Sequence, residues 1–198
     1  MELKSYVLGP IATNTYLLQI DNDVLLIDPA SKPEKLIDIL GDRNLLGILL
    51  THGHFDHIKA VDGLYKKYNC PIYLHHDDEK YARDKYSGID FGISSYITCP
   101  TISPSEGKNK IGPFEFNVIY TPGHTPGSLI YIFDNKMFTG DTLFRLSAGR
   151  TDLAGGDDNA LRQSLKIFKY CDKDYEIYPG HDAPSTLSFE LENNPYLK

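Results

Sequence analysis

Cysteine is scarce and scattered in this chain of 198 residues. The three cysteines, Cys70, Cys99 and Cys171, form none of the closely spaced pairs that a zinc knuckle or a redox dithiol needs. Free cysteine is among the most buried residue types. We therefore expect three reduced thiols that pack as small buried or half-buried side chains.

Long apolar runs are also missing. The longest one, at residues 45–50, is far short of the roughly 20 residues that span a bilayer. The N-terminus lacks the basic start, the apolar stretch and the small-residue cleavage site of a secretory signal. These absences predict a cytoplasmic protein without a membrane partner.

The chain has no surplus of positive charge. Its 20 lysine and arginine residues face 27 aspartate and glutamate residues, which gives a formal net charge of −7 at pH 7. Proteins that bind nucleic acid release counterions from the phosphate backbone with clustered lysine and arginine. The acidic balance therefore argues against a nucleic-acid partner. The sequence carries no signal for an oligomeric state.

The apolar pattern predicts a single domain of mixed α and β elements over residues 1–198, without repeats or linkers. Helical spacing of apolar residues predicts helices over 33–40, over 58–68 and after Asp157. Residues 77–89 are helical or irregular, and 87–110 carry no clear signal. Runs rich in β-branched and aromatic residues predict strands at 6–8, 15–20, 24–27, 45–50, 71–74, 114–120, 129–133, 136–139 and 175–178.

The segment Thr51-His52-Gly53-His54-Phe55-Asp56-His57 follows directly after the strand at 45–50. An extended chain places His52 and His54 on one side, and the turn into the next helix moves Asp56 and His57 to a second position. Neutral imidazole nitrogen and carboxylate oxygen suit zinc, iron or manganese. The segment therefore predicts two neighbouring metal positions.

Three further candidate ligands, His124, Asp141 and His181, each lie just past a predicted strand. In folds that place helices outside a sheet, reactive groups gather on loops beyond one edge of the strands. A glycine precedes each of the three, and glycine permits a tight turn that aims the next side chain inward. We expect all three to join the histidine segment.

These motifs resemble the metallo-β-lactamase superfamily, whose pattern is His-x-His-x-Asp-His followed by a separate His, a bridging Asp and a final His. The resemblance begins at Gly9-Pro10, includes Asn14-Thr15-Tyr16-Leu17 and Asp28-Pro29, and runs to the end of the chain. It implies an α/β (α+β) fold, a four-layer αββα sandwich with the metals at one edge. The implied ligands are His52, His54 and His124 for a first metal, Asp56, His57 and His181 for a second, and Asp141 as a bridge, with Asp28 supporting the metal-binding loop.

The stretch from Gly140-Asp141-Thr142-Leu143-Phe144 to Gly149-Arg150-Thr151-Asp152 is similar to glyoxalase II, the hydroxyacylglutathione hydrolases, and especially to their short single-domain bacterial relatives. The resemblance implies two divalent metal ions, zinc foremost, with iron or manganese as alternatives. Glyoxalase II proper carries a helical glutathione-binding domain after the last ligand, and we expect none here. No cysteine lies near the motifs, which argues against one group of true β-lactamases and against antibiotic hydrolysis.

The activity that the resemblance implies is hydrolysis of a small-molecule thioester such as S-lactoylglutathione, by a hydroxide that bridges the two metals. Asp56 is the expected catalytic residue, which orients the hydroxide or accepts its proton. Arg150 is the candidate substrate-binding residue, because its guanidinium can pair with a carboxylate. An internal ion pair with Asp152 is the other interpretation of Arg150. His75-His76-Asp77-Asp78 is read as a solvated turn with an aspartate helix cap.

Three alternatives stay open. Persulfide dioxygenases share this fold, and His52 or His54 with His124 and Asp141 could hold their single iron. A nuclease of the same superfamily would also use two metals, but the acidic balance disfavours it. A binding protein with structural metals is the third, although every expected ligand is present.

Overall fold

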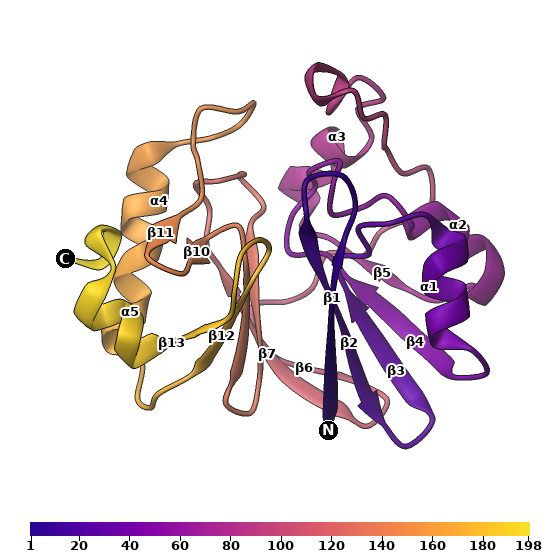
Figure 1. Cartoon of the computed structure of the whole chain (residues 1–198), viewed down its shortest axis with the longest axis horizontal. Helices are drawn as coiled ribbons and strands as arrows, with labels where there is room; N and C mark the ends of the chain where they lie inside the picture. The colour runs from indigo at the N-terminus through magenta and orange to yellow at the C-terminus, as the bar shows by residue number, and fades with distance from the viewer.

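The computed structural model describes residues 1–198, the whole chain. Two β-sheets face each other, and helices cover the outer side of each sheet (Figure 1). The first half of the chain builds one sheet and the second half builds the other. The predicted four-layer αββα sandwich is therefore confirmed.

The first sheet has the strand order β1-β2-β3-β4-β5. Its strands are β1 (Glu2–Leu8), β2 (Thr13–Ile20), β3 (Asp23–Ile27), β4 (Asn44–Leu49) and β5 (Ile72–Tyr73). Strands β3, β4 and β5 run parallel, because the helices α1 (Pro33–Leu40) and α2 (Val61–Tyr68) return the chain to the same end of the sheet. Their carboxyl ends therefore share one edge, where Asp28 and the histidine segment follow.

The second sheet has the strand order β13-β12-β9-β8-β7-β6. Its strands are β6 (Gly107–Ile111), β7 (Phe114–Tyr120), β8 (Leu129–Phe133), β9 (Lys136–Gly140), β12 (Glu176–Pro179) and β13 (Ser185–Thr186). Strand β12 lies parallel to β9, and Pro179 pairs with Gly140 at their carboxyl ends. Asp141 and His181 therefore leave the sheet at the same edge.

The remaining elements are short. Helices α4 (Asp158–Leu165) and α5 (Leu187–Asn193) cover the second sheet (Figure 1). The others are the ribbon of β10 (Leu143–Phe144) and β11 (Ser147–Ala148), the helix α3 (Glu79–Ala82), and the 3-10 turns η1 (His76–Asp78), η2 (Ile89–Phe91), η3 (Lys166–Tyr170) and η4 (Pro195–Leu197). None of the helices combines the length and the apolar character that a membrane span requires.

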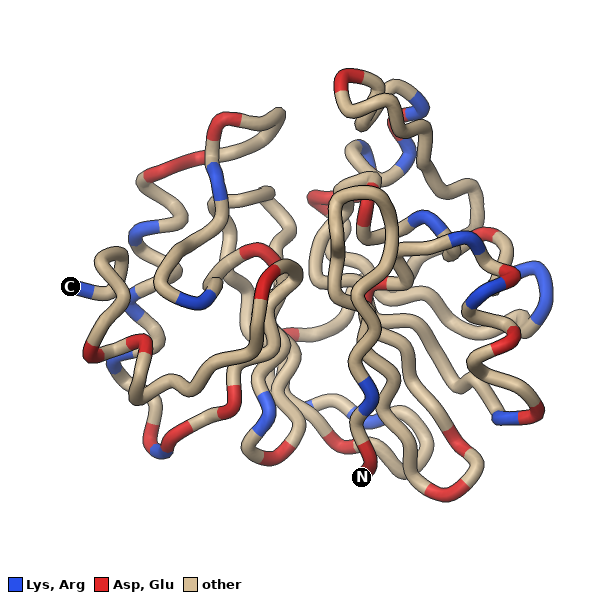
Figure 2. Tube along the Cα trace, viewed as in Figure 1, with Lys and Arg blue, Asp and Glu red and all other residues tan.

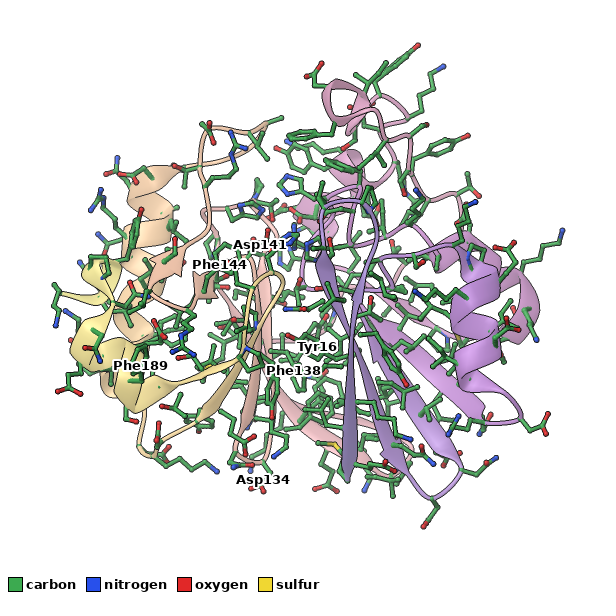
Figure 3. All side chains as sticks on the ribbon, viewed as in Figure 1. Tyr16, Asp134, Phe138, Asp141, Phe144 and Phe189 are labelled. Carbon is green, nitrogen blue, oxygen red and sulfur yellow. The ribbon has the colours of Figure 1, made fainter.

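Three apolar layers hold the sandwich together. One lies between the first sheet and α1 and α2, one between the two sheets, and one between the second sheet and α4 and α5. In the middle layer the rings of Tyr16 and Phe138 meet edge to face with centroids 5.0 Å apart (Figure 3). Burying a large apolar side chain stabilises a fold by about 1.5–3 kcal/mol. Packing of the two sheets therefore fixes the loops at the edge of one sheet relative to the loops at the edge of the other.

The cysteines lie within these layers or at their margin. Cys70 and Cys99 are buried and Cys171 is half-buried, as their scatter in the sequence predicts. Burial raises the pKa of the Cys70 thiol to about 11 and that of Cys99 to about 12. These thiols therefore stay protonated at neutral pH.

Charged residues lie around the outside of the molecule and on its connecting loops, while the facing strands carry few (Figure 2). Acidic positions from both halves also lie where the loops of the two sheets meet (Figure 2). This edge is where the predicted metal ligands gather.

Candidate metal centre

The seven predicted ligands come together at the edge where the loops of the two sheets meet. The loop after β4 supplies four of them, His52, His54, Asp56 and His57. The loops after β7, β9 and β12 supply the other three, His124, Asp141 and His181. Asp141 lies between the two halves of the molecule (Figure 3). Neither sheet alone therefore carries a complete set.

The first group is His52, His54 and His124, whose ring nitrogens lie within 4.8 Å of one another. All three side chains are buried. The Nδ1 of His124 donates to the backbone carbonyl of Arg150 at 2.7 Å, which directs Nε2 into the site. That Nε2 lies 2.8 Å from Nδ1 of His54. Three imidazoles therefore converge on one point.

The second group is Asp56, His57 and His181, also within 4.8 Å of one another. Thr13 donates a hydrogen bond of 2.7 Å to Asp56 Oδ2. His181 Nε2 lies 3.3 Å from the same oxygen, and His57 Nε2 lies 3.2 Å from it. This group offers two nitrogens and one oxygen at a position next to the first.

The Asp141 carboxylate lies between the two groups. Its Oδ2 is 3.4 Å from His124 Nε2 and 3.6 Å from His181 Nε2, and its Oδ1 is 3.5 Å from His57 Nε2. Gly180 contacts it so closely that a Cβ there would lie 2.1 Å from Asp141 Oδ1. This is the position that a bridging ligand requires.

Three buried polar atoms in the site have no hydrogen-bond partner: His52 Nε2, His57 Nε2 and Asp141 Oδ1. Leaving a buried donor or acceptor unpaired costs about 1–3 kcal/mol, and such atoms are rare in native proteins. Three of them at one point indicate that a cation is their partner. The nitrogen and oxygen donors fit two divalent metal ions.

The electrostatics of the site suit a cation as well. Burial, reinforced by the neighbouring imidazoles, lowers the pKa of His52 well below its usual value, and burial lowers that of His54 to about 3. Both rings are therefore neutral and offer lone pairs. Burial works against ionisation of Asp56, but the charge of His57 and the hydrogen bonds from His181, His57 and Thr13 together outweigh it and hold the pKa of that carboxyl well below its usual range.

Asp28 holds the histidine segment in place through hydrogen bonds. Its carboxylate accepts hydrogen bonds from Thr51 N at 2.8 Å, from Thr51 Oγ1 at 2.6 Å and from His57 Nδ1 at 2.9 Å. Burial alone would lower the pKa of His57, but the carboxylates of Asp56, Asp141 and Asp28 raise it well above its usual value. The contacts of Asp28 are those of a support for the metal-binding loop.

Asp78 has a role that the sequence did not indicate. The prediction of a solvated cap is wrong for this residue, which is fully buried, and its side chain caps no helix. Its carboxylate accepts hydrogen bonds from Gly53 N at 2.8 Å, Thr125 Oγ1 at 2.7 Å and Gly127 N at 2.7 Å. Asp78 thus joins the loop of His52 and His54 to the loop of His124. Its place just after β5, at the same sheet edge, was the available signal.

Of the three residues before Asp78, one is buried and two are exposed. His75 is buried, and its Nδ1 accepts a hydrogen bond from the backbone N of Asp77. His76 and Asp77 are exposed, as a solvated turn requires. The predicted turn therefore holds for its middle residues alone.

A cleft of about 360 Å³ lies over the ligands. Arg150 lines this cleft, but its guanidinium is bonded to Asp152, with Nε at 2.6 Å and Nη2 at 2.7 Å from the two carboxylate oxygens. The Arg150 hydrogen bond lowers the pKa of Asp152 to about 2. The structure therefore shows the internal ion pair, and substrate binding by Arg150 stays a prediction.

Residues 8–181 match the family model of the metallo-beta-lactamase superfamily. The chain is 33% identical to the probable metallo-hydrolase YqgX of Bacillus subtilis, over 100% of this chain and 98% of that protein. It is 32% identical to the hydroxyacylglutathione hydrolase GloC of Haemophilus influenzae, over 89% of this chain and 88% of that protein.

Solved structures agree. The B3 metallo-beta-lactamase BLEG-1 is 37% identical over the whole of both chains, with a TM-score of 0.92. TTHA1623, solved in a di-iron-bound form, is 35% identical over 98% of this chain and all of that chain, with a TM-score of 0.89. ETHE1 from Myxococcus xanthus is 26% identical over 98% of this chain and 84% of that chain, with a TM-score of 0.80. The chain therefore belongs to the metallo-β-lactamase superfamily and is a metal-dependent hydrolase.

Proposed function

We propose that this enzyme hydrolyses small-molecule thioesters, with S-lactoylglutathione as the first substrate to test. The observation that carries the proposal is the pair of three-residue groups that share the Asp141 carboxylate. A pair of divalent ions held there supplies an activated water and an electrophile for the thioester carbonyl. The likeness to GloC, described as a hydroxyacylglutathione hydrolase, supports a thioester as the substrate.

The residues of the chain supply orientation and proton transfer. Thr13 holds the Asp56 carboxylate at 2.7 Å, so this carboxylate keeps one direction in the cleft. The hydrogen bond from Thr13 favours the ionised carboxylate, which is the form that can accept a proton. Asp56 therefore acts as the acceptor that orients the attacking water and takes its proton.

The first experiment combines metal analysis with turnover. We expect close to two divalent ions per chain, with hydrolysis of S-lactoylglutathione. The di-iron form of TTHA1623 means that zinc, iron and manganese should each be quantified. Two bound metals without turnover of any thioester would contradict the proposal.

The substitution Asp141→Asn tests the bridging role. It removes the charge that both groups share, so metal content and thioester turnover should fall together, the latter by about 10²-fold or more. Asp134→Asn is the matched control, because Asp134 lies exposed at the opposite end of the second sheet (Figure 3). Full activity of Asp141→Asn with both metals retained would refute the bridging assignment.

A mononuclear iron dioxygenase is the second candidate. The observation that favours it is that His124 and Asp141 lie 3.4 Å apart next to His52 and His54, either of which completes the set of two histidines and one carboxylate that can hold one iron. Oxygen uptake with glutathione persulfide and one iron per chain would replace the hydrolase proposal. The likeness to BLEG-1 makes a β-lactam the third substrate to assay, and turnover above that of the thioester would also overturn the proposal.

A further inference from the structure

Aromatic and aliphatic side chains wall the cleft above the metal centre. They come from separate parts of the chain: the β1–β2 turn, the metal-binding loop, η2, β10 and the loop before α4. These side chains are Ile11, Phe55, Phe91, Phe144 and Leu153. Because loops from both halves contribute, the wall surrounds the position where a substrate would meet the ligands.

One side of this wall is built on the metal-binding loop itself. Phe55 stands between the ligands His54 and Asp56, and Phe91 stacks on it with ring centroids 5.4 Å apart and planes at 28°. Gly88 seats the η2 turn on Phe55, because a Cβ at Gly88 would lie 2.5 Å from that ring. Phe91 remains 48% exposed. It therefore presents a free aromatic face to the cleft.

The opposite side is formed around β10. The ring of Phe144 lies 6.1 Å from the ring of His181, at an interplanar angle of 73°. Phe144 lies beside Asp141 on the side of the cleft that the second half of the chain forms (Figure 3). A substrate group that enters between Phe91 and Phe144 would thus have apolar surface on two sides.

The cleft has no unpaired cationic side chain for an anionic substrate group. Arg150 is the one lysine or arginine that lines it, and Asp152 already binds one edge of that guanidinium, through Nε and Nη2. Apart from the proposed metal ligands, the other charged group in the lining is the carboxylate of Asp182. Binding at the mouth therefore depends on apolar contact, which is how small-molecule sites gain most of their affinity.

We infer that this cleft selects thioesters with an apolar acyl group, aryl or branched alkyl, over the small polar lactoyl group. The inference rests on the proposed function. In the reaction, the oxygen of water forms a bond to the acyl carbon, the carbon–sulfur bond breaks, and the thiol leaves with a proton. The cleft of about 360 Å³ is near the lower end of ligand pockets, which span about 300–1,000 Å³. It suits an acyl group better than a whole tripeptide thiol.

The test varies the acyl group and keeps the thiol constant. S-lactoyl, S-acetyl, S-isobutyryl and S-benzoyl glutathione are hydrolysed by the metal-loaded enzyme, and each kcat/KM is divided by the rate of hydroxide-catalysed hydrolysis. We expect this normalised kcat/KM to be about tenfold or more higher for the benzoyl and isobutyryl thioesters than for the lactoyl thioester, since one methylene group in a hydrophobic pocket discriminates by about tenfold or more.

Two variants test whether Phe91 causes the preference for apolar acyl groups. Phe91→Ala should bring the ratio of benzoyl to lactoyl close to one. Ile89→Ala is the matched control, because Ile89 is 63% exposed on the same turn and lies outside the cleft lining. It should leave the ratio unchanged. A ratio of one in the parent enzyme, or a ratio that Phe91→Ala does not alter, would overturn the inference while the thioesterase activity stands.

Binding of thioethers separates this inference from the proposed function, because thioethers are not hydrolysed. S-benzyl and S-methyl glutathione are titrated by calorimetry into the metal-loaded protein and into Phe91→Ala. Tighter binding of the benzyl compound, lost in the variant, supports the apolar site even if no thioester turns over. Equal affinity for both compounds would overturn the inference, whatever the turnover.

Discussion

Asp78 is a single carboxylate that fixes two loops. Its three donors, Gly53 N, Thr125 Oγ1 and Gly127 N, lie beside ligands of the three-histidine group. Burial raises the pKa of this carboxyl, although the hydrogen bonds partly offset the effect. Asp78 is therefore a positioning residue that acts through His52, His54 and His124.

Asp78→Asn keeps the volume of the side chain but turns an amide donor toward groups that also donate. Each lost hydrogen bond to a buried carboxylate costs about 1.5–3 kcal/mol, so the free energy of unfolding should fall by about 2–4 kcal/mol in urea denaturation. Metal content should fall as well, because the first group loses its geometry. The neighbouring Asp77→Asn is the control, since Asp77 is exposed. Equal metal content in both variants would contradict the positioning role.

The sequence predicted the residues that meet at the site, because each candidate follows a strand and strand ends share an edge. It did not reveal Asp78 as a tether, because its partners are remote in sequence, with Thr125 47 positions away. The sequence was also insufficient to assign Arg150. It allowed either substrate binding or an ion pair with Asp152, and the distance of 2.6 Å between Arg150 Nε and Asp152 Oδ1 shows the ion pair.

At the level of elements, strong apolar patterns predicted α1, β7 and β8 over their full lengths, and β9 except for its last residue, Gly140. Strand β6 was missed, because its sequence Gly-Lys-Asn-Lys-Ile is polar and it forms only by pairing with β7 at the edge of the sheet. Helix α2 begins at Val61 instead of residue 58, since the residues before it turn around the metal centre.

Helix α4 packs directly against Gly123, the residue that precedes the predicted ligand His124. A Cβ at Gly123 would lie 2.3 Å from the backbone of Leu161 in α4, and its φ of +143° disfavours other residues. Gly123→Ala must therefore shift either the helix or the neighbouring ligand His124. We expect the free energy of unfolding to fall by about 2–4 kcal/mol, with a loss of bound metal.

Gly107→Ala is the control that separates the effect of backbone strain from the effect of a steric clash with α4. Gly107 also has a positive φ, of +86°, but nothing lies within 4 Å of the added Cβ. Gly107→Ala should lower the free energy of unfolding by about 1 kcal/mol and leave the metal content unchanged. If the two alanine variants lost the same stability and metal, the contact between Gly123 and α4 would not be the cause.

At the scale of the whole molecule, the metal centre joins the two sheets. Ligands that bind the native state alone stabilise it by about 2.7–4.1 kcal/mol at 100 to 1,000 times their Kd. For a chain of this size, a chelator should therefore lower the Tm by roughly 5–15 °C. Differential scanning calorimetry with and without a chelator measures this shift. Asp141→Asn should show a smaller shift, and an equal one would contradict a shared carboxylate.

The division of the ligands between the two halves has a consequence for assembly. His52 and His181 lie far apart in sequence and on opposite sheets, so tight metal binding needs both sheets in place and docked. We expect contacts between such distant segments to form late in folding, because the loop they close is long. Uptake of the ion is thus a reporter of completed tertiary structure. A coloured chelator that competes for the metal during refolding would record the moment when the halves dock, after each sheet has already acquired its own hydrogen bonds.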